Sequence, residues 1–223
     1  MPEDTETRLH DSLFKVLVVG DEGSGKSCLC NCIANNKFSE ENNLLYVTNI
    51  TTDKTARLVI WEKPETQLDG KTSHFYRGVA GVIIVYDTTA KNAFSNIRER
   101  IHEIEQYAKD DVIIMLAGTK SDNTSQRQVN LLTAREFAEC RRWNLFETSA
   151  KDNSNVENLF SEMAHELLSQ KENRQKHYLS EPQKPSKVNT RKHRGRKSFI
   201  DKGFSYFHGL RRGYAQIPVE ETH

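Results

Sequence analysis

One eight-residue segment near the start of the chain limits the fold more than any other feature. Residues 20–27, with the sequence GDEGSGKS, fit the pattern G-x-x-x-x-G-K-[ST]. The apolar run FKVLVV at residues 14–19 precedes them and predicts a buried strand, and a helix is expected over residues 26–34. In this context the glycines let backbone N–H groups turn towards an anion, and the helix start adds its dipole. The segment therefore predicts a strand, a phosphate-binding loop and a helix in succession.

The residue types in this loop assign roles within it. Lys26 is expected to reach the β- and γ-phosphates of a nucleotide, and Ser27 to give its hydroxyl oxygen to Mg²⁺, which prefers oxygen ligands. The residues expected to bind phosphate are Gly20, Glu22, Gly23, Ser24, Gly25, Lys26, Ser27 and Cys28.

Strand-like and helical patterns alternate along the chain up to residue 168. Further strands are predicted at residues 44–50, 56–62, 81–86, 112–116 and 145–147, and helices at 91–108, 131–142 and 156–168. Such alternation predicts an α/β fold, with a mostly parallel six-stranded sheet and helices on both faces. Ligands of such sheets bind at the carboxyl ends of the strands, where the motifs of this chain fall.

Two later segments indicate which base the nucleotide carries. Asp122 follows the strand at 112–116, and its carboxylate can accept hydrogen bonds from N1–H and the 2-amino group of guanine. Adenine lacks this pair of donors and would leave the charge unpaired. The aliphatic stem of Lys120 can lie along the base, and the backbone N–H near Ala150 could bind the guanine carbonyl. Each segment alone also fits an ordinary polar turn, but their order after a phosphate loop favours a guanine nucleotide.

Together these motifs resemble those of Ras-superfamily small GTPases over about residues 13–168. Thr119 stands where Asn is usual, as it does in Rho-type members. The segments YRG at residues 76–78, VYDTT at 85–89 and FSNI at 94–97 are similar to Rab proteins in particular. The resemblance implies the P-loop NTPase (small G protein) fold, GTP/GDP and Mg²⁺ as ligands, and hydrolysis of GTP to GDP and phosphate. It implies guanine contacts from Phe38, Thr119, Lys120, Asp122, Ser149, Ala150 and Lys151.

The chain departs from this family in both segments that contact the γ-phosphate. Glu62 stands where the third strand should end in Asp, and it could still hold Mg²⁺ through a water molecule. Glu65 replaces a Gly, and Thr66 replaces the Gln that orients the attacking water. No catalytic residue is therefore assigned, and we expect weak hydrolysis.

The first switch segment is shorter than in family members. The Thr that should close over Mg²⁺ is hard to place: Thr48, Thr51 and Thr52 are candidates, and Asn49 occupies the aligned position. Of the three candidates we name Thr48 for the metal site, and Thr51 and Thr52 stay open as alternatives.

The two ends of the chain differ in charge. Residues 1–170 carry 19 Lys+Arg against 26 Asp+Glu, a net of −7, whereas residues 171–223 carry 13 against 5, a net of +8. We divide the chain into an N-terminal extension (1–12), a G domain (13–170), a disordered linker (171–190) and a basic, aromatic, disordered tail (191–223). The basic run at 191–197 and the aromatic residues after it fit an anionic membrane surface, a nuclear import or RNA contact, or a solubilising tail.

The two ends of the sequence also indicate where in the cell the protein is expected. The acidic start lacks a signal peptide, Pro2 excludes N-myristoylation, and no cysteine follows Cys140 to carry a prenyl group. We expect a cytoplasmic monomer, peripheral on the cytosolic face of intracellular or plasma membranes and without a prenyl or myristoyl anchor, which binds effector and regulatory proteins of small GTPases. A Rab-like switch in vesicle traffic or signalling fits best. An RGK-like scaffold with little hydrolysis and a nucleic-acid-associated GTPase are the alternatives, and the base-recognition motifs make nucleic acid the weaker one.

Overall fold

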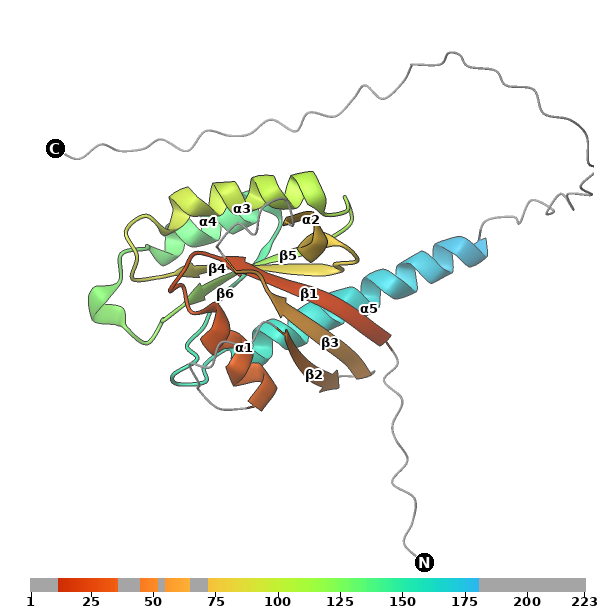
Figure 1. Ribbon diagram of the computed structural model, residues 1–223, viewed down its shortest axis with the longest axis horizontal. Helices are drawn as coiled ribbons and strands as arrows, with labels where there is room; N and C mark the ends of the chain where they lie inside the picture. Colours follow the sequence, from red (N-terminus) through yellow and green to blue (C-terminus); the bar gives the residue numbers. More distant parts are fainter. Residues whose placement is uncertain (1–11, 36–44, 52–54, 65–71, 181–223) are drawn as a thin grey trace, which may run out of the picture. The chain divides into compact units, whose positions relative to one another are not determined.

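The apolar runs of the sequence form the buried strands of a six-stranded sheet in the computed structural model, which describes residues 12–35, 45–51, 55–64 and 72–180 (Figure 1). Its strands lie in the order β2-β3-β1-β4-β5-β6. Only β2 runs antiparallel to its neighbour, β3; the other adjacent pairs described are parallel. The strands are β1 (Ser12–Gly20), β2 (Leu45–Thr51), β3 (Thr55–Glu62), β4 (Gly81–Asp87), β5 (Ile113–Thr119) and β6 (Asn144–Glu147).

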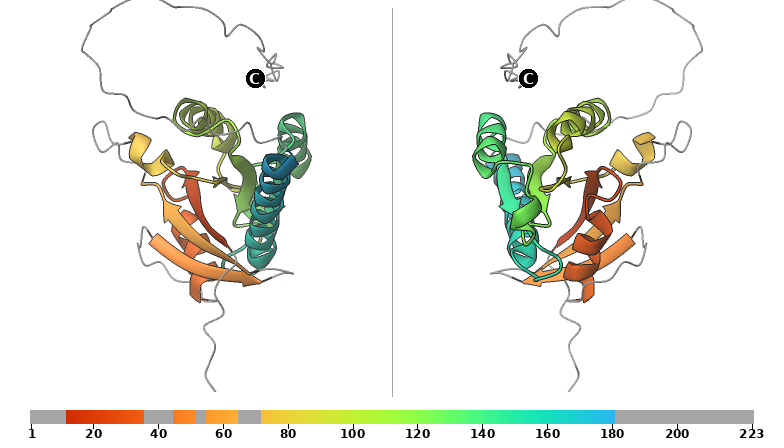
Figure 2. Two further views of the ribbon diagram at one scale, coloured as in Figure 1. Left: turned by 90° about the vertical axis from the view of Figure 1, so that its right-hand side faces the viewer. Right: turned by 90° about the vertical axis from the view of Figure 1, so that its left-hand side faces the viewer.

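Helices cover both faces of this sheet, as the side views in Figure 2 show. Alternate side chains of β1 point to opposite faces: Val16 and Val18 pack with α1 and α5, and Leu17 and Val19 pack with α2, α3 and α4. The helices are α1 (Lys26–Asn35), α2 (Thr72–Tyr76), α3 (Ala93–Tyr107), α4 (Leu131–Arg141) and α5 (Val156–Ser180), with a 3₁₀ turn at Thr124–Gln126. The predicted α/β fold class is confirmed, whereas the short α2 and the 3₁₀ turn were not predicted.

The last helix is longer than its apolar pattern indicates. Apolar periodicity ends at Leu168, but α5 continues to Ser180. Polar contacts fasten this extension: Lys171 Nζ donates to Ser12 Oγ at 2.6 Å, Gln170 Nε2 donates to the Asp111 carbonyl at 2.7 Å, and Arg174 pairs with Asp111. The prediction of a linker beginning at residue 171 is therefore wrong for residues 171–180. The rest of the predicted linker and the tail at 191–223 lie outside the described residues.

Within the described ranges, none of the helices is long and apolar enough to cross a bilayer.

Candidate nucleotide-binding site

The predicted phosphate loop lies at the carboxyl end of β1 and leads directly into α1. Gly20 is required there because a Cβ atom would lie 2.3 Å from the Val85 carbonyl oxygen of the neighbouring strand. Gly25 has a φ of +89°, a conformation that L side chains rarely adopt. Lys26 Nζ folds back over the loop and donates to the Asp21 carbonyl at 2.5 Å. The loop thus has the tight turn that the motif predicts, and Cys28 is half-buried in the first turn of α1.

Ser27 and Glu62 meet beside this loop. Ser27 Oγ donates a hydrogen bond of 2.8 Å to Glu62 Oε1, although the two residues come from different elements, α1 and β3. Burial raises the pKa of the Glu62 carboxyl, against the opposing effects of the Ser27 hydrogen bond and the Lys26 charge. A hydroxyl and a carboxylate fit Mg²⁺, which is usually held by one or two carboxylates together with substrate phosphates. The structure brings the two assigned residues together; metal binding itself stays a prediction.

The third residue assigned to the metal, Thr48, lies elsewhere. It sits in the middle of β2, opposite Leu58, and Leu58 is four residues before Glu62 along β3. The register of this pair does not bring Thr48 to Ser27, because each residue advances a strand by about 3.3 Å. Phe38, Glu65 and Thr66 lie outside the described residues, so the structure does not place them.

The predicted base-recognition residues gather at the carboxyl ends of β5 and β6. Ser149 Oγ donates to Asp122 Oδ1 at 2.7 Å, and Lys151 Nζ lies 3.9 Å from Asp122 Oδ2. The Ser149 hydroxyl accepts in turn from the Asp152 backbone N–H at 3.1 Å. Asp122 is therefore held in one orientation, with 17% of its side chain exposed. Ala150 lies in the same loop, and its carbonyl oxygen is 3.8 Å from Cys32 Sγ of α1.

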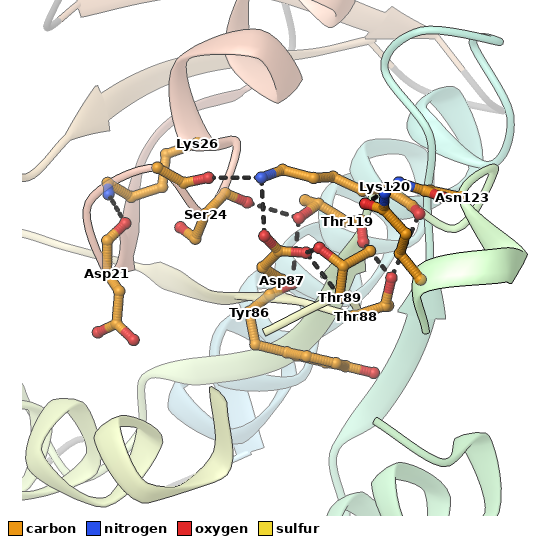
Figure 3. A network of polar contacts seen from close by, with 12 residues as sticks. Asp21, Ser24, Lys26, Tyr86, Asp87, Thr88, Thr89, Thr119, Lys120 and Asn123 are labelled. Atoms are coloured by element: carbon orange, nitrogen blue, oxygen red, sulfur yellow. Dashed lines mark hydrogen bonds and ion pairs between the residues drawn. The ribbon is translucent and has the colours of Figure 1, made fainter. Parts of the chain in front are cut away.

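Lys120 and Thr119 connect this base side to the phosphate loop (Figure 3). Lys120 Nζ donates to the Gly23 carbonyl at 2.8 Å and pairs with Asp87 Oδ2 at 2.7 Å. Thr119 is buried, and its hydroxyl donates to the Ser24 carbonyl at 2.5 Å. The side chain of Thr119 thus contacts the protein rather than projecting into open space. Lys120 has the left-handed backbone angle φ of 58°, which turns its side chain back across the loop.

Sequence reasoning did not assign Asp87 to the site. Its carboxylate accepts from Lys120 and from both the backbone N–H and the hydroxyl of Thr89, at 2.8 and 2.7 Å for the latter two. Burial alone would raise the pKa of Asp87, but these hydrogen bonds outweigh it and hold the pKa below its ordinary value. One signal could have found this pair, since Asp87 and Lys120 follow two predicted strands, 81–86 and 112–116, that a parallel sheet can place side by side.

A second ion pair that the sequence did not predict lies next to the base-recognition residues. Arg127 forms a two-pronged contact with Glu147, with Nη1–Oε1 at 2.6 Å and Nη2–Oε2 at 2.9 Å. Glu147 ends β6 immediately before the Ser149 loop. Paired bonds of this kind are stronger and more directional than single ones, so this contact fixes where the loop begins.

The comparison with known families agrees with this geometry. A family model described as the Ras family matches residues 15–169. The matched range contains the phosphate loop, the Asp122 segment and the Ser149 segment, and it covers well over half of the 223 residues.

Proposed function

Since the chain belongs to the Ras family of GTP-binding switch proteins, we propose that it is a Rab-like switch in intracellular vesicle traffic or signalling. The Rab-like segments at 76–78, 85–89 and 94–97 support the subtype. Its ligands are GTP and GDP with Mg²⁺, the metal being held by Ser27 directly and by Glu62 through water. Its partners are effector and regulatory proteins that distinguish the two nucleotides.

The observation that carries nucleotide binding is the bridge from Asp122 to the phosphate loop. Ser149 fixes the Asp122 carboxylate, and Lys120 of the same loop reaches Gly23. A guanine base at Asp122 and phosphates at Lys26 would therefore be bound by one continuous surface at the carboxyl ends of β1, β5 and β6. Such a site recognises both ends of the nucleotide at once, which a phosphate loop alone cannot do.

A second candidate function follows from the residues after β3. With Glu65 and Thr66 in place of Gly and Gln, the protein fits an RGK-like scaffold that holds nucleotide and hydrolyses little or none of it. We further propose that the protein is cytosolic and meets the cytosolic face of a membrane through its basic tail.

The proposed function is tested by identifying what the purified full chain retains. The protein is denatured, and the released nucleotide is separated by anion-exchange chromatography. An approximately equimolar amount of GDP or GTP supports the proposal, whereas adenine nucleotides alone would overturn it. Single-turnover hydrolysis of bound GTP then bears on the two candidates: slow but measurable conversion to GDP supports the switch, and no detectable conversion supports the scaffold.

A further inference from the structure

A group of polar side chains on the other side of the phosphate loop has no part in the contacts described above. It joins the phosphate loop, the residue after β3, the end of α2 and one face of α3. We call it the α3 brace and define it as Asp21, Lys63, Tyr76, Asn96, Arg100 and Glu103.

Glu103 of α3 is the centre of this group. Its Oε2 atom lies 2.9 Å from Lys63 Nζ and accepts a hydrogen bond of 3.1 Å from the Tyr76 hydroxyl. Its Oε1 atom accepts from Arg100 Nη1 at 3.0 Å. One carboxylate therefore receives donors from the residue that follows Glu62, from α2 and from its own helix.

Asp21 carries the brace into the phosphate loop. Asn96 Nδ2 donates to Asp21 Oδ2 at 2.7 Å, and Arg100 Nη2 lies 3.8 Å from Asp21 Oδ1. The carboxylate of Asp21 accordingly points away from the Lys26 amine, which binds the backbone carbonyl of the same residue (Figure 3). Arg100 thus lies between two carboxylates, one in the loop and one on α3.

The charged side chains of the α3 brace are mostly buried as well as hydrogen-bonded to one another. The exposed fractions of the side chains are 7% for Lys63, 10% for Arg100 and 22% for Glu103. Charges with so little exposure are weakly screened and stay paired. The chain at Lys63 is also fixed through its backbone, because Lys63 N–H donates to the Val18 carbonyl of β1 at 3.0 Å. The ion pair with Glu103 and the hydrogen bond to Val18 therefore both fix Lys63, the residue next to Glu62.

We propose that Glu103 is a positioning residue for the nucleotide site. Through Lys63 it sets the position of Glu62, the carboxylate on the metal side. Through Arg100 and Asp21 it sets the position of the phosphate loop. The two halves of the site are therefore held in register by α3, a helix that contributes none of the predicted base- or phosphate-binding residues. This role rests on the proposed function, since it presupposes a guanine nucleotide with Mg²⁺.

The consequence is measurable in the dependence of nucleotide release on Mg²⁺. A residue that only stabilises the fold would change release equally with and without the metal. A residue that positions Glu62 should mainly affect how strongly Mg²⁺ slows nucleotide release. Loss of contacts that hold a metal ligand in place typically weakens metal affinity 10- to 100-fold. We expect Glu103→Gln to lower the ratio of release rates, measured without and with Mg²⁺, by about tenfold.

The experiment uses the full chain loaded with the fluorescent N-methylanthraniloyl derivative of GDP. Release into excess GDP is followed in Mg²⁺ and in EDTA for the unmodified protein, Glu103→Gln and Glu99→Gln. Glu99 is the matched control, because it is an exposed glutamate of the same helix. Should Glu103→Gln fail to fold, the double variant Lys63→Met with Glu103→Met removes the ion pair without leaving Lys63 unpaired, and it should lower the ratio similarly.

The outcomes separate the two proposals. A tenfold lower ratio in either Glu103 variant, with Glu99→Gln unchanged, supports the positioning role. If the unmodified protein retains the GDP derivative in Mg²⁺ but a folded Glu103 variant shows the same ratio as Glu99→Gln, the positioning role is overturned and nucleotide binding stands. If the unmodified protein binds no guanine nucleotide, the proposed function fails and the inference fails with it.

Discussion

Replacing Asp122 by Ala should abolish the preference for guanine over adenine. The carboxylate can accept two hydrogen bonds from guanine, and bonds to a charged group contribute about 1.5–3 kcal/mol each. The pair could thus provide about 3–6 kcal/mol, but 17% of the side chain is exposed and Ser149 already occupies one acceptor position. The lower end of the range, about 3 kcal/mol, is therefore expected, which corresponds to roughly a hundredfold in affinity.

The assay is competition against the fluorescent GDP derivative by GDP and by ADP. The unmodified protein should prefer GDP by at least about a hundredfold, and Asp122→Ala should bind both with similar affinity. Asp152→Ala is the matched control, because Asp152 is exposed in the same loop and contacts Ser149 through its backbone N–H alone. A hundredfold preference that survives in Asp122→Ala, or equal binding of ADP and GDP to the unmodified protein, would refute the assignment of the base site.

Four further outcomes are expected. Intrinsic hydrolysis, measured as phosphate release in a single turnover, should fall below about 10⁻⁴ s⁻¹, and Glu65→Gly with Thr66→Gln should raise it; a rate at or above that value without these changes would contradict the alignment. The Tyr86 hydroxyl is buried and has no hydrogen-bond partner among the residues that the structure describes, so Tyr86→Phe should leave the free energy of unfolding in urea unchanged or raise it by up to about 1 kcal/mol. A clear loss of stability would show that the hydroxyl has a partner. Because the pKa of Asp87 lies below its ordinary value of 3.8, its stabilisation is present above that pH and lost as the pH falls through the lowered pKa. Asp87→Asn should therefore lower stability at neutral pH, with the difference narrowing in acid. In cosedimentation, the full chain should bind anionic vesicles more weakly at high salt, and a chain ending at Gln170 should bind them less; equal binding would make the tail a solvated extension.

The sequence predicted those site residues whose roles depend on their near neighbours along the chain. Gly20 and Gly25 are needed by one turn of backbone, and Asp122 and Ser149 follow strands that the apolar runs predict. Their roles depend on residues within a few positions along the chain or on the general rule that parallel strands end at the same edge.

The parts that sequence could not place depend on pairs distant in the chain. The Lys63–Glu103 ion pair requires knowing that α3 comes close to the residue after β3, and nothing in either segment indicates its partner. The prediction that the last helix ends at residue 168 was wrong for a related reason. It is fastened by Lys171 and Arg174, polar residues that an apolar period does not register.

Charge balance explains why so many of these contacts involve carboxylates. An acidic G domain must accept a polyanionic nucleotide. Asp21 belongs to the phosphate loop, Glu62 accepts a hydrogen bond from Ser27 of that loop, and Asp87 pairs with Lys120, which donates to the Gly23 carbonyl. Arg100 and Asn96 hold the side-chain carboxylate of Asp21 away from the Lys26 amine. Lys120 neutralises the carboxylate of Asp87, whose pKa is lowered. Glu62 differs, because its carboxyl receives a hydroxyl rather than a cation as its nearest donor and its pKa is raised. Of the three, it is the carboxylate whose charge is best balanced by a divalent cation. The protein itself thus pairs two of these acidic groups with cations, and we propose the third, Glu62, for the metal that would accompany the nucleotide.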